Sequence, residues 1–310
     1  NHLICRVAAQ PVVNTPETLT TLVDKAFANI PTKELTQWNG KLEYHDTDWD
    51  SIFVLAQTNP KIRELLLRLD QAAQKIMQTN SSMYIRALKY SDIPTDMVDS
   101  IALKSKNNRD IRALALFDCT QTRFLFDDVV RLALAARFTG NIQYLNKTIE
   151  ILHEVVKYKP FQRPGWSLGD DDRTLPPDGD GPNMATAWGI FAVVDILYIL
   201  EDSIPKELKE QLKNNLREEI YGVVKGWANK LPWYVQSRAV MTNQWTDPTT
   251  GLIKACLYLG ESEFISAYNL GVENIAASLN ASAGDGAFLE GVAYAQMSAG
   301  EMISVVDNIR

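Results

Sequence analysis

The chain has 310 residues, of which 46% are hydrophobic and 22% are charged, a composition that is typical of a folded globular protein and excludes a disordered one. Its formal net charge of −7 provides no overall basic field to attract nucleic acid, so we expect no nucleic-acid partner. No apolar run reaches the roughly 18 to 20 residues that a membrane span requires, so we expect no membrane partner either.

The first 55 residues differ in pattern from the rest of the chain. They contain Trp38 and Trp49 among Thr, Asn and Pro residues, with only one short predicted helix at 18–28, and we expect residues 1–55 to form an N-terminal arm packed on a helical body of residues 56–310. In that body, apolar residues at three- and four-residue steps predict a one-sided helix at 61–79. The same spacing predicts helices at 122–138, 142–158, 184–200 and 207–227.

The helical pattern continues after Trp227 in shorter segments. Helices are predicted at 234–241, 251–259, 263–280 and 291–308, and strand patterns of useful length are nearly absent. Successive helices joined by short loops predict an all-α protein of antiparallel helical hairpins, arranged as an α-solenoid or an α/α toroid. No residue-level repeat is visible, which favours an incomplete α/α toroid. The last helical pattern has no terminating Gly or Pro, so we expect the natural chain to continue past Arg310.

The sequence gives no sign of a bound metal or a cofactor. Cys5, Cys119 and Cys256 are odd in number and widely spaced, which argues against a disulfide framework and a zinc site. The acidic turn at Asp178 and Asp180 faintly resembles a calcium loop, but the regular ligand spacing is missing and a solvated turn is the simpler interpretation. Nucleotide-binding, zinc-protease and serine-hydrolase signatures are also missing.

A long loop at 163–183 is the first candidate for a functional site. It is rich in Gly, Pro and Asp and lies between two predicted helices, and loops of this length in compact domains are often functional. Arg163, Trp166 and Arg173 lie in it. A ring to stack on and guanidinium groups to clamp a carboxylate are what the binding of a sugar acid needs.

The second candidate is the run 233–245, "WYVQSRAVMTNQW", which ends in an apparent helix-breaking loop. Arg238 and Asn243 lie five residues apart at the predicted helix end and are expected to face one cleft. The uncharged Asn amide suits a carboxylate that gains negative charge during a reaction. Trp233, Gln244 and Trp245 are candidate substrate contacts; the alternatives are a helix-capping role for Asn243 and a core position for Trp245.

The third candidate is the glycine-rich stretch "DGAFLEGVAY" at 285–294. Tyr294 falls in the first turn of the last predicted helix, with Glu290 four residues before it. The positive end of a helix dipole favours the phenolate form of a tyrosine. The alternative is that Tyr294 only packs in the core or at its rim.

Together, the second and third stretches resemble the heparinase II/III family of polysaccharide lyases, which share an α/α toroid with chondroitin AC and alginate lyases. The resemblance covers residues 185–303 and depends on an Asn-Asn-Trp-like element at Asn243 and an Asp-Gly-x-x-x-Glu-Gly-x-x-Tyr-like element that ends at Tyr294. It implies that Asn243 neutralises a substrate carboxylate, that Tyr294 is the catalytic acid or base, and that Glu290 supports the loop. Gln244 stands where relatives have Asn or His, and relatives often take their remaining catalytic residue from a β-sandwich domain that follows the toroid.

The resemblance implies a lyase that cleaves an acidic, uronate-containing polysaccharide or oligosaccharide by β-elimination, in the periplasm or outside the cell. Neutralising the carboxylate makes the C5 proton more acidic, and a phenol then protonates the leaving oxygen. A cation such as Arg238 is expected to favour the phenolate of Tyr294. Two alternatives stay open: a non-catalytic carbohydrate-binding or scaffold toroid, and an α/α-barrel glycoside hydrolase with Asp172 or Asp180 about 5 to 9.5 Å from Glu290.

Overall fold

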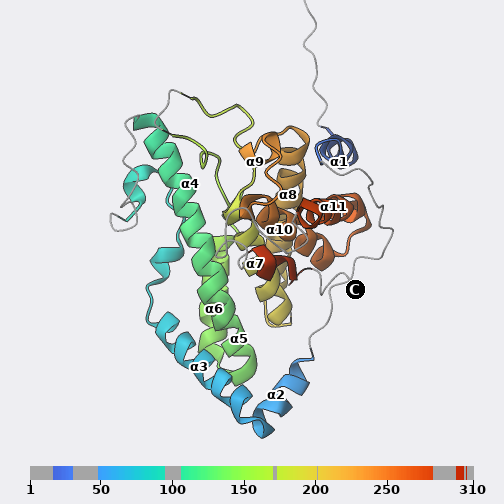
Figure 1. Cartoon of the computed structure of the whole chain (residues 1–310). Coiled ribbons are helices and arrows are strands. Elements are labelled where there is room, and N and C mark those ends of the chain that lie inside the picture. The colour runs from blue at the N-terminus through green and yellow to red at the C-terminus, as the bar shows by residue number, and fades with distance from the viewer. Residues whose placement is uncertain are drawn as a thin grey trace, which may run out of the picture.

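The computed structural model describes residues 17–30, 48–94, 106–169, 173–200, 202–281, 298–303 and 305. Every regular element in these segments is a helix, which confirms the predicted all-α class for the described chain (Figure 1). None of the helices in these segments is both long enough and apolar enough to cross a membrane. Most of the expected arm at residues 1–55 lies outside the described residues, so its packing stays a prediction.

The described helices follow one another along the chain as α1 Leu19–Phe27, α2 Trp49–Thr58, α3 Pro60–Met77, η1 Ser81–Tyr84, η2 Tyr90–Asp92, α4 Lys106–Phe124, the π-helical turn η4 Leu125–Val129, α5 Val130–Thr139, α6 Ile142–Val155, α7 Met184–Ile199, α8 Lys206–Ala228, α9 Trp233–Gln236, α10 Asn243–Leu259, η5 Ser262–Phe264 and α11 Ile265–Ala281. The predicted helices at 18–28, 61–79, 142–158, 184–200, 207–227 and 263–280 are confirmed within a few residues. Three predictions need correction. The segment 122–138 contains the end of α4, a π turn and α5, the helix at 234–241 is only the four-residue α9, and α10 starts eight residues before the predicted 251.

Helices begin and end at residues that favour capping, as the hairpin of α5 and α6 shows. Gly140 ends α5 in the left-handed conformation, with φ of 65°, which a residue without a Cβ adopts most easily. Asn141 follows at once and caps α6, because its side-chain oxygen accepts the backbone N–H of Gln143 at 2.9 Å. Two residues therefore reverse the chain and pack α6 beside α5.

Helices α7 and α10 form the centre of the described structure. Twelve of the sixteen residues of α7 and fourteen of the seventeen residues of α10 are buried. Helix α10 packs between α7 and α11 and also contacts α8, whereas α4 and α5 cover another side of α7 (Figure 1). A Cβ on Gly251 would come within 3.1 Å of the Ala187 backbone, so the two central helices touch closely at this position.

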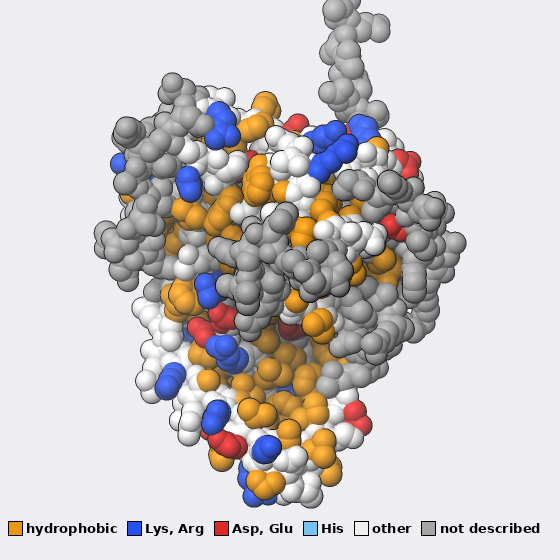
Figure 2. All heavy atoms as spheres, in the orientation of Figure 1, with side chains coloured by type: hydrophobic (Ala, Val, Ile, Leu, Met, Phe, Trp, Pro, Cys, Tyr) orange, Lys and Arg blue, Asp and Glu red, His pale blue; other side chains and the backbone are white. Residues whose placement is uncertain are grey.

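Helices α2 and α3 project from this body and leave apolar side chains in solvent. Helix α2 buries only Ala56, and about half of the Phe53, Val54 and Leu55 side chains is exposed. Figure 2 shows orange side chains gathered over this end of the molecule. The hairpin contributes little apolar burial, and the core of the described chain lies mainly among α4 to α11.

Candidate polar site at the start of helix α10

The sequence suggested that the stretch "TNQWTDPTTG" is a helix-breaking loop. In the structure it forms the cap and first half of α10. Thr242 caps the helix, because its hydroxyl accepts the backbone N–H of Trp245 at 3.3 Å. Pro248 lies inside the helix and lacks the N–H that would bond to the carbonyl of Gln244. Burial on all sides stabilises this segment enough to accept the loss, and the Thr249 hydroxyl donates back to a backbone carbonyl at 2.7 Å.

Asn243 begins α10 and lies against the start of α7. Its side chain is only 3% exposed, and its Nδ2 lies 3.2 Å from the Sδ atom of Met184, the first residue of α7. The first turns of the two central helices therefore meet at this amide. The predicted carboxylate-neutralising group is inside the helix junction and presents little of its surface to solvent.

Three residues predicted to contact a substrate, Trp233, Arg238 and Gln244, lie in or between α9 and the start of α10. The indole N–H of Trp233 donates to the Gln244 side-chain oxygen, which fixes the ring while 42% of it stays exposed. Arg238 follows α9, is exposed, and has a φ of 55°, an uncommon value for a residue with a side chain. Lys230, before α9, is also exposed and has a φ of 51°. We call Lys230, Trp233, Arg238 and Gln244 the α9 surface; it combines an exposed aromatic ring with two exposed cations that flank it in the sequence.

Arg163, predicted to clamp a sugar acid, is instead committed to a buried carboxylate. Asp118 is fully buried and accepts the Arg163 Nε at 2.8 Å and Nη2 at 2.6 Å. Arg86 also binds this carboxylate through Nε at 3.0 Å and Nη2 at 2.6 Å. Such a shared, bidentate arrangement holds the loop after α6 against α4 and leaves this guanidinium little freedom to meet a ligand.

The remaining residues of the loop candidate have other described contacts. Trp166 is half-buried, and Arg173 is exposed while its carbonyl accepts the Asn108 side chain at 3.2 Å. Asp180, an acid of the hydrolase alternative, accepts hydrogen bonds from the backbone N–H groups of Gly165 at 2.8 Å and Ser167 at 2.7 Å. These hydrogen bonds join two parts of the same loop. Nothing in the described contacts brings these residues to Asn243.

Trp245 occupies the core. It is fully buried, and its indole N–H donates to the Asn274 carbonyl at 3.1 Å. Its ring packs edge-on against Trp227 and Tyr234, with centroids 5.7 and 6.4 Å away. In this structure the ring offers no face to a sugar, and Trp233 is the exposed tryptophan of the pair.

Tyr294 and Glu290 lie outside the described residues, as does Asp172. The proposed pairing of Asn243 with Tyr294 and the carboxylate separation of the hydrolase alternative therefore stay predictions.

A carboxyl pair that the sequence analysis missed lies one helical turn below Asn243. Asp247 of α10 is fully buried, and the Glu301 carboxyl lies near it and near Trp188 of α7. Burial raises the pKa of Glu301 above its ordinary value. Residues four apart lie on the same face of a helix, so a helix prediction for this stretch would have placed Asn243 and Asp247 together. The Asp247-Pro248 dipeptide suggested a turn instead.

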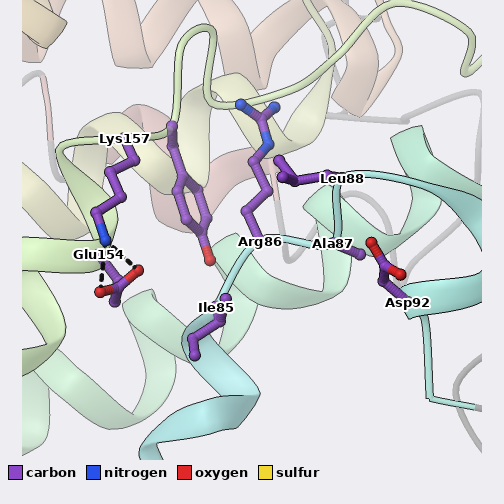
Figure 3. Close-up of a pocket in the computed structure, with 8 residues that line it drawn as sticks. Ile85, Arg86, Ala87, Leu88, Asp92, Glu154 and Lys157 are labelled. Carbon is purple, nitrogen blue, oxygen red and sulfur yellow. Dashed lines mark hydrogen bonds and ion pairs between the residues drawn. The ribbon is translucent and has the colours of Figure 1, made fainter.

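A separate pocket of ≈ 520 Å³ opens between the 85–92 segment and the end of α6 (Figure 3). Tyr158 forms one wall, with the Arg86 guanidinium 5.2 Å from its ring centroid. Lys157 and Glu154 face one another at one side of the pocket, 2.7 Å apart, and Asp92 lies at the other. Burial keeps the pKa of Tyr158 far above its ordinary value, so its phenol stays neutral. No residue predicted for the lyase site lines this pocket.

No protein-family model matches the chain, and neither a curated protein nor a solved structure matches it. The function is therefore argued from the residues of the site itself.

Proposed function

We propose that the chain is the helical domain of a polysaccharide lyase that cleaves an acidic, uronate-containing glycan by β-elimination, in the periplasm or outside the cell. The observation that carries the proposal is the α9 surface beside Asn243. An exposed indole fixed by Gln244 provides a stacking face, and Lys230 and Arg238 provide cations for carboxylate or sulfate groups. This combination of ring and cations suits an acidic sugar chain.

The proposed reaction divides its steps among an amide, a phenol and a cation. The Asn243 amide donates to the uronate carboxylate as the C5–H bond breaks and negative charge develops there. Tyr294 starts as a phenolate, accepts the C5 proton and returns it from the resulting phenol to the 4-linked oxygen as the C4–O bond breaks, so a C4–C5 double bond forms and the phenolate is regenerated. Arg238 stabilises the phenolate that is present before the first proton transfer and after the second.

We also propose that the helical hairpins belong to an incomplete α/α toroid. Helices α5 and α6, α7 and α8, and α10 and α11 follow one another as sequential pairs, and α7 packs directly against α10. The contact between Asn243 and Met184 supports a parallel arrangement of these two central helices, because it joins their first turns. Inner helices that point the same way would bring their starts to one end of the ring.

The test is incubation of the purified full-length protein with heparan sulfate, alginate, hyaluronan and chondroitin, followed by low-ultraviolet absorbance of the unsaturated product. We expect absorbance to rise with one of these glycans, to stop with Tyr294→Phe, and to require more substrate with Trp233→Ala. Lys61→Ala on α3 is the matched surface control and should leave the rate unchanged. A folded protein that yields no product from any of the four glycans would refute the lyase proposal.

The burial of Asn243 favours a second candidate, a non-catalytic carbohydrate-binding toroid. An amide that is 3% exposed and lies against a thioether is poorly placed to reach a large substrate. In this case glycan binding should depend on Trp233 and weaken with salt, because the cations of the α9 surface are exposed. Binding that survives Tyr294→Phe without product would support this candidate over the lyase.

A further inference from the structure

The pocket between the 85–92 segment and the end of α6 has walls that the fold holds in place (Figure 3). Residues 85–89 lie between the two turns η1 and η2 and form no helix of their own. The side chain of Gln121 on α4 is fully buried, and its amide donates to the carbonyls of Met83 and Ile85, both at 2.9 Å. One buried side chain thus fixes the backbone of this segment at two points.

Two more side chains fix the same backbone. The hydroxyl of Tyr158, just after α6, donates to the carbonyl of Tyr84. Nη1 of Arg163 donates to the carbonyl of Ala87 at 2.7 Å. Four carbonyls between residues 83 and 87 therefore accept hydrogen bonds from side chains, and such contacts keep the walls of a binding site in one geometry before a ligand arrives.

This fixed segment leaves apolar side chains in solvent at the pocket. Ile85 is 53% exposed and Leu88 is 83% exposed, and both line the pocket. The hydrogen bonds to the backbone oppose a rearrangement that would turn these side chains inward. An apolar ligand would displace water from both side chains, and removing apolar surface from water favours binding.

The charged residues that line the pocket balance one another. Two of them are cations and two are anions, and each has an opposite charge beside it: Arg86 pairs with Asp118 at 2.6 Å, Glu154 with Lys157 at 2.7 Å, and Asp92 with Lys89 at 3.8 Å. A ligand with a net charge would have to break one of these pairs or lose its water without gaining a partner, and either event costs free energy. An uncharged ligand avoids this cost.

The size of the pocket indicates a small molecule. Its volume of ≈ 520 Å³ falls within the range of roughly 300 to 1,000 Å³ that is typical of small-molecule sites. Such sites are lined mainly by apolar side chains with a few polar groups, and here Ile85, Ala87 and Leu88 provide the apolar part.

We propose that this pocket binds a small, uncharged and largely apolar organic molecule. The described lining of the pocket includes no residue of the α9 surface, so this site is separate from the proposed glycan site. Its ligand binding does not depend on the lyase function.

Titration of the purified protein with N-phenyl-1-naphthylamine, an uncharged probe that fluoresces in apolar surroundings, tests this proposal. We expect saturable binding that does not change between low and high salt, because no ion pair forms with the probe. The anion 1-anilinonaphthalene-8-sulfonate has the same ring system. It should bind at least about tenfold more weakly, because each cation of the lining already has a carboxylate as its partner.

Variants locate the probe on the protein. Leu88→Ser and Ile85→Ser should each raise the dissociation constant of the uncharged probe about tenfold, because each removes an apolar wall. Both side chains are largely exposed, so both variants should fold as the wild type does. Leu67→Ser is the matched control, because Leu67 is 58% exposed on α3 and is not part of the described lining. Leu67→Ser and Trp233→Ala, the latter on the α9 surface, should bind the probe with unchanged affinity.

Three results would overturn the proposal. They are the lack of saturable binding of the uncharged probe, an affinity for the anion that equals or exceeds that for the uncharged probe, and equal weakening in Leu88→Ser and Leu67→Ser. The titration contains no glycan, so its failure and the failure of the lyase proposal are separate outcomes.

Discussion

Replacing Glu219 with Gln should remove a large pH dependence from the stability of the protein. Glu219 is buried on α8 and accepts the Phe161 backbone N–H at 2.6 Å. Burial raises the pKa of this carboxyl from 4.5 to about 8, and the Phe161 N–H and the charge of Arg86 offset only part of that effect. At neutral pH the carboxyl is therefore protonated in the folded protein and ionised in the unfolded chain.

The sign and size of the effect follow from this difference. Between pH 4.5 and 8 the folded state holds one more proton than the unfolded state, so the free energy of unfolding falls as pH rises. The slope is about 1.36 kcal/mol per pH unit for one proton, or about 4 kcal/mol between pH 5 and 8. Below pH 4.5 both states are protonated and above pH 8 both are ionised, so the effect is confined to this interval.

Urea unfolding of wild type and Glu219→Gln at pH 5, 6, 7 and 8 measures this difference directly. The Gln oxygen can still accept the Phe161 N–H, so the two proteins should have similar free energies of unfolding at pH 5. At pH 8 the free energy of unfolding of the variant should exceed that of the wild type by about 4 kcal/mol. Glu218→Gln is the matched control, because Glu218 is the neighbouring residue but is exposed and pairs with Lys159. A difference between wild type and Glu219→Gln that is the same at all four pH values would refute the reasoning.

Three further predictions concern packing and buried charge. Asp118→Asn should lower the free energy of unfolding by about 3 to 5 kcal/mol in urea, because it leaves two partly buried guanidinium groups without their fully buried carboxylate. Trp245→Ala should lower the free energy of unfolding by about 3 to 5 kcal/mol, whereas Trp233→Ala, at an exposed ring, should lower it by less than about 1 kcal/mol. Equal losses in the two variants would contradict the assignment of Trp245 to the core and Trp233 to the surface. Gly226→Ala should cost about 1 to 3 kcal/mol, because its Cβ would lie 2.3 Å from a proline ring. Gly222→Ala, on the same helix with open space around it, should stabilise by up to about 1 kcal/mol in thermal unfolding.

The helices that the sequence predicted well are those with a one-sided apolar pattern. Segments 61–79 and 207–227 alternate apolar and polar residues at helical spacing, and α3 and α8 form there. The start of α10 was missed because local signals favour a turn: Thr242 and Asn243 are common caps, and Asp247-Pro248 is a common turn dipeptide. Burial against α7 and α11 outweighs these local preferences, and this packing is a tertiary effect that no short window of sequence contains.

The site residues show the same division between local and tertiary information. Trp233 and Gln244 are near in sequence, and their proximity could be expected. The partner of Arg163 could not, because Asp118 lies 45 residues earlier and no spacing rule links them. The proximity of Glu301 to Asp247 is equally non-local, because no spacing rule links these two residues.

The π turn Leu125–Val129 adds one residue between α4 and α5 relative to a continuous α-helix. Successive residues lie about 100° apart around a helix axis, so the extra residue turns every side chain of α5 by that angle with respect to α4. Helix α4 can then face α7 while α5 faces α3 and α6. A chain shortened by one residue here would keep its helical propensity and its composition but would direct the buried Leu132 and Ala135 away from the core. The length of this stretch, more than the identity of its residues, is what a related sequence would have to preserve.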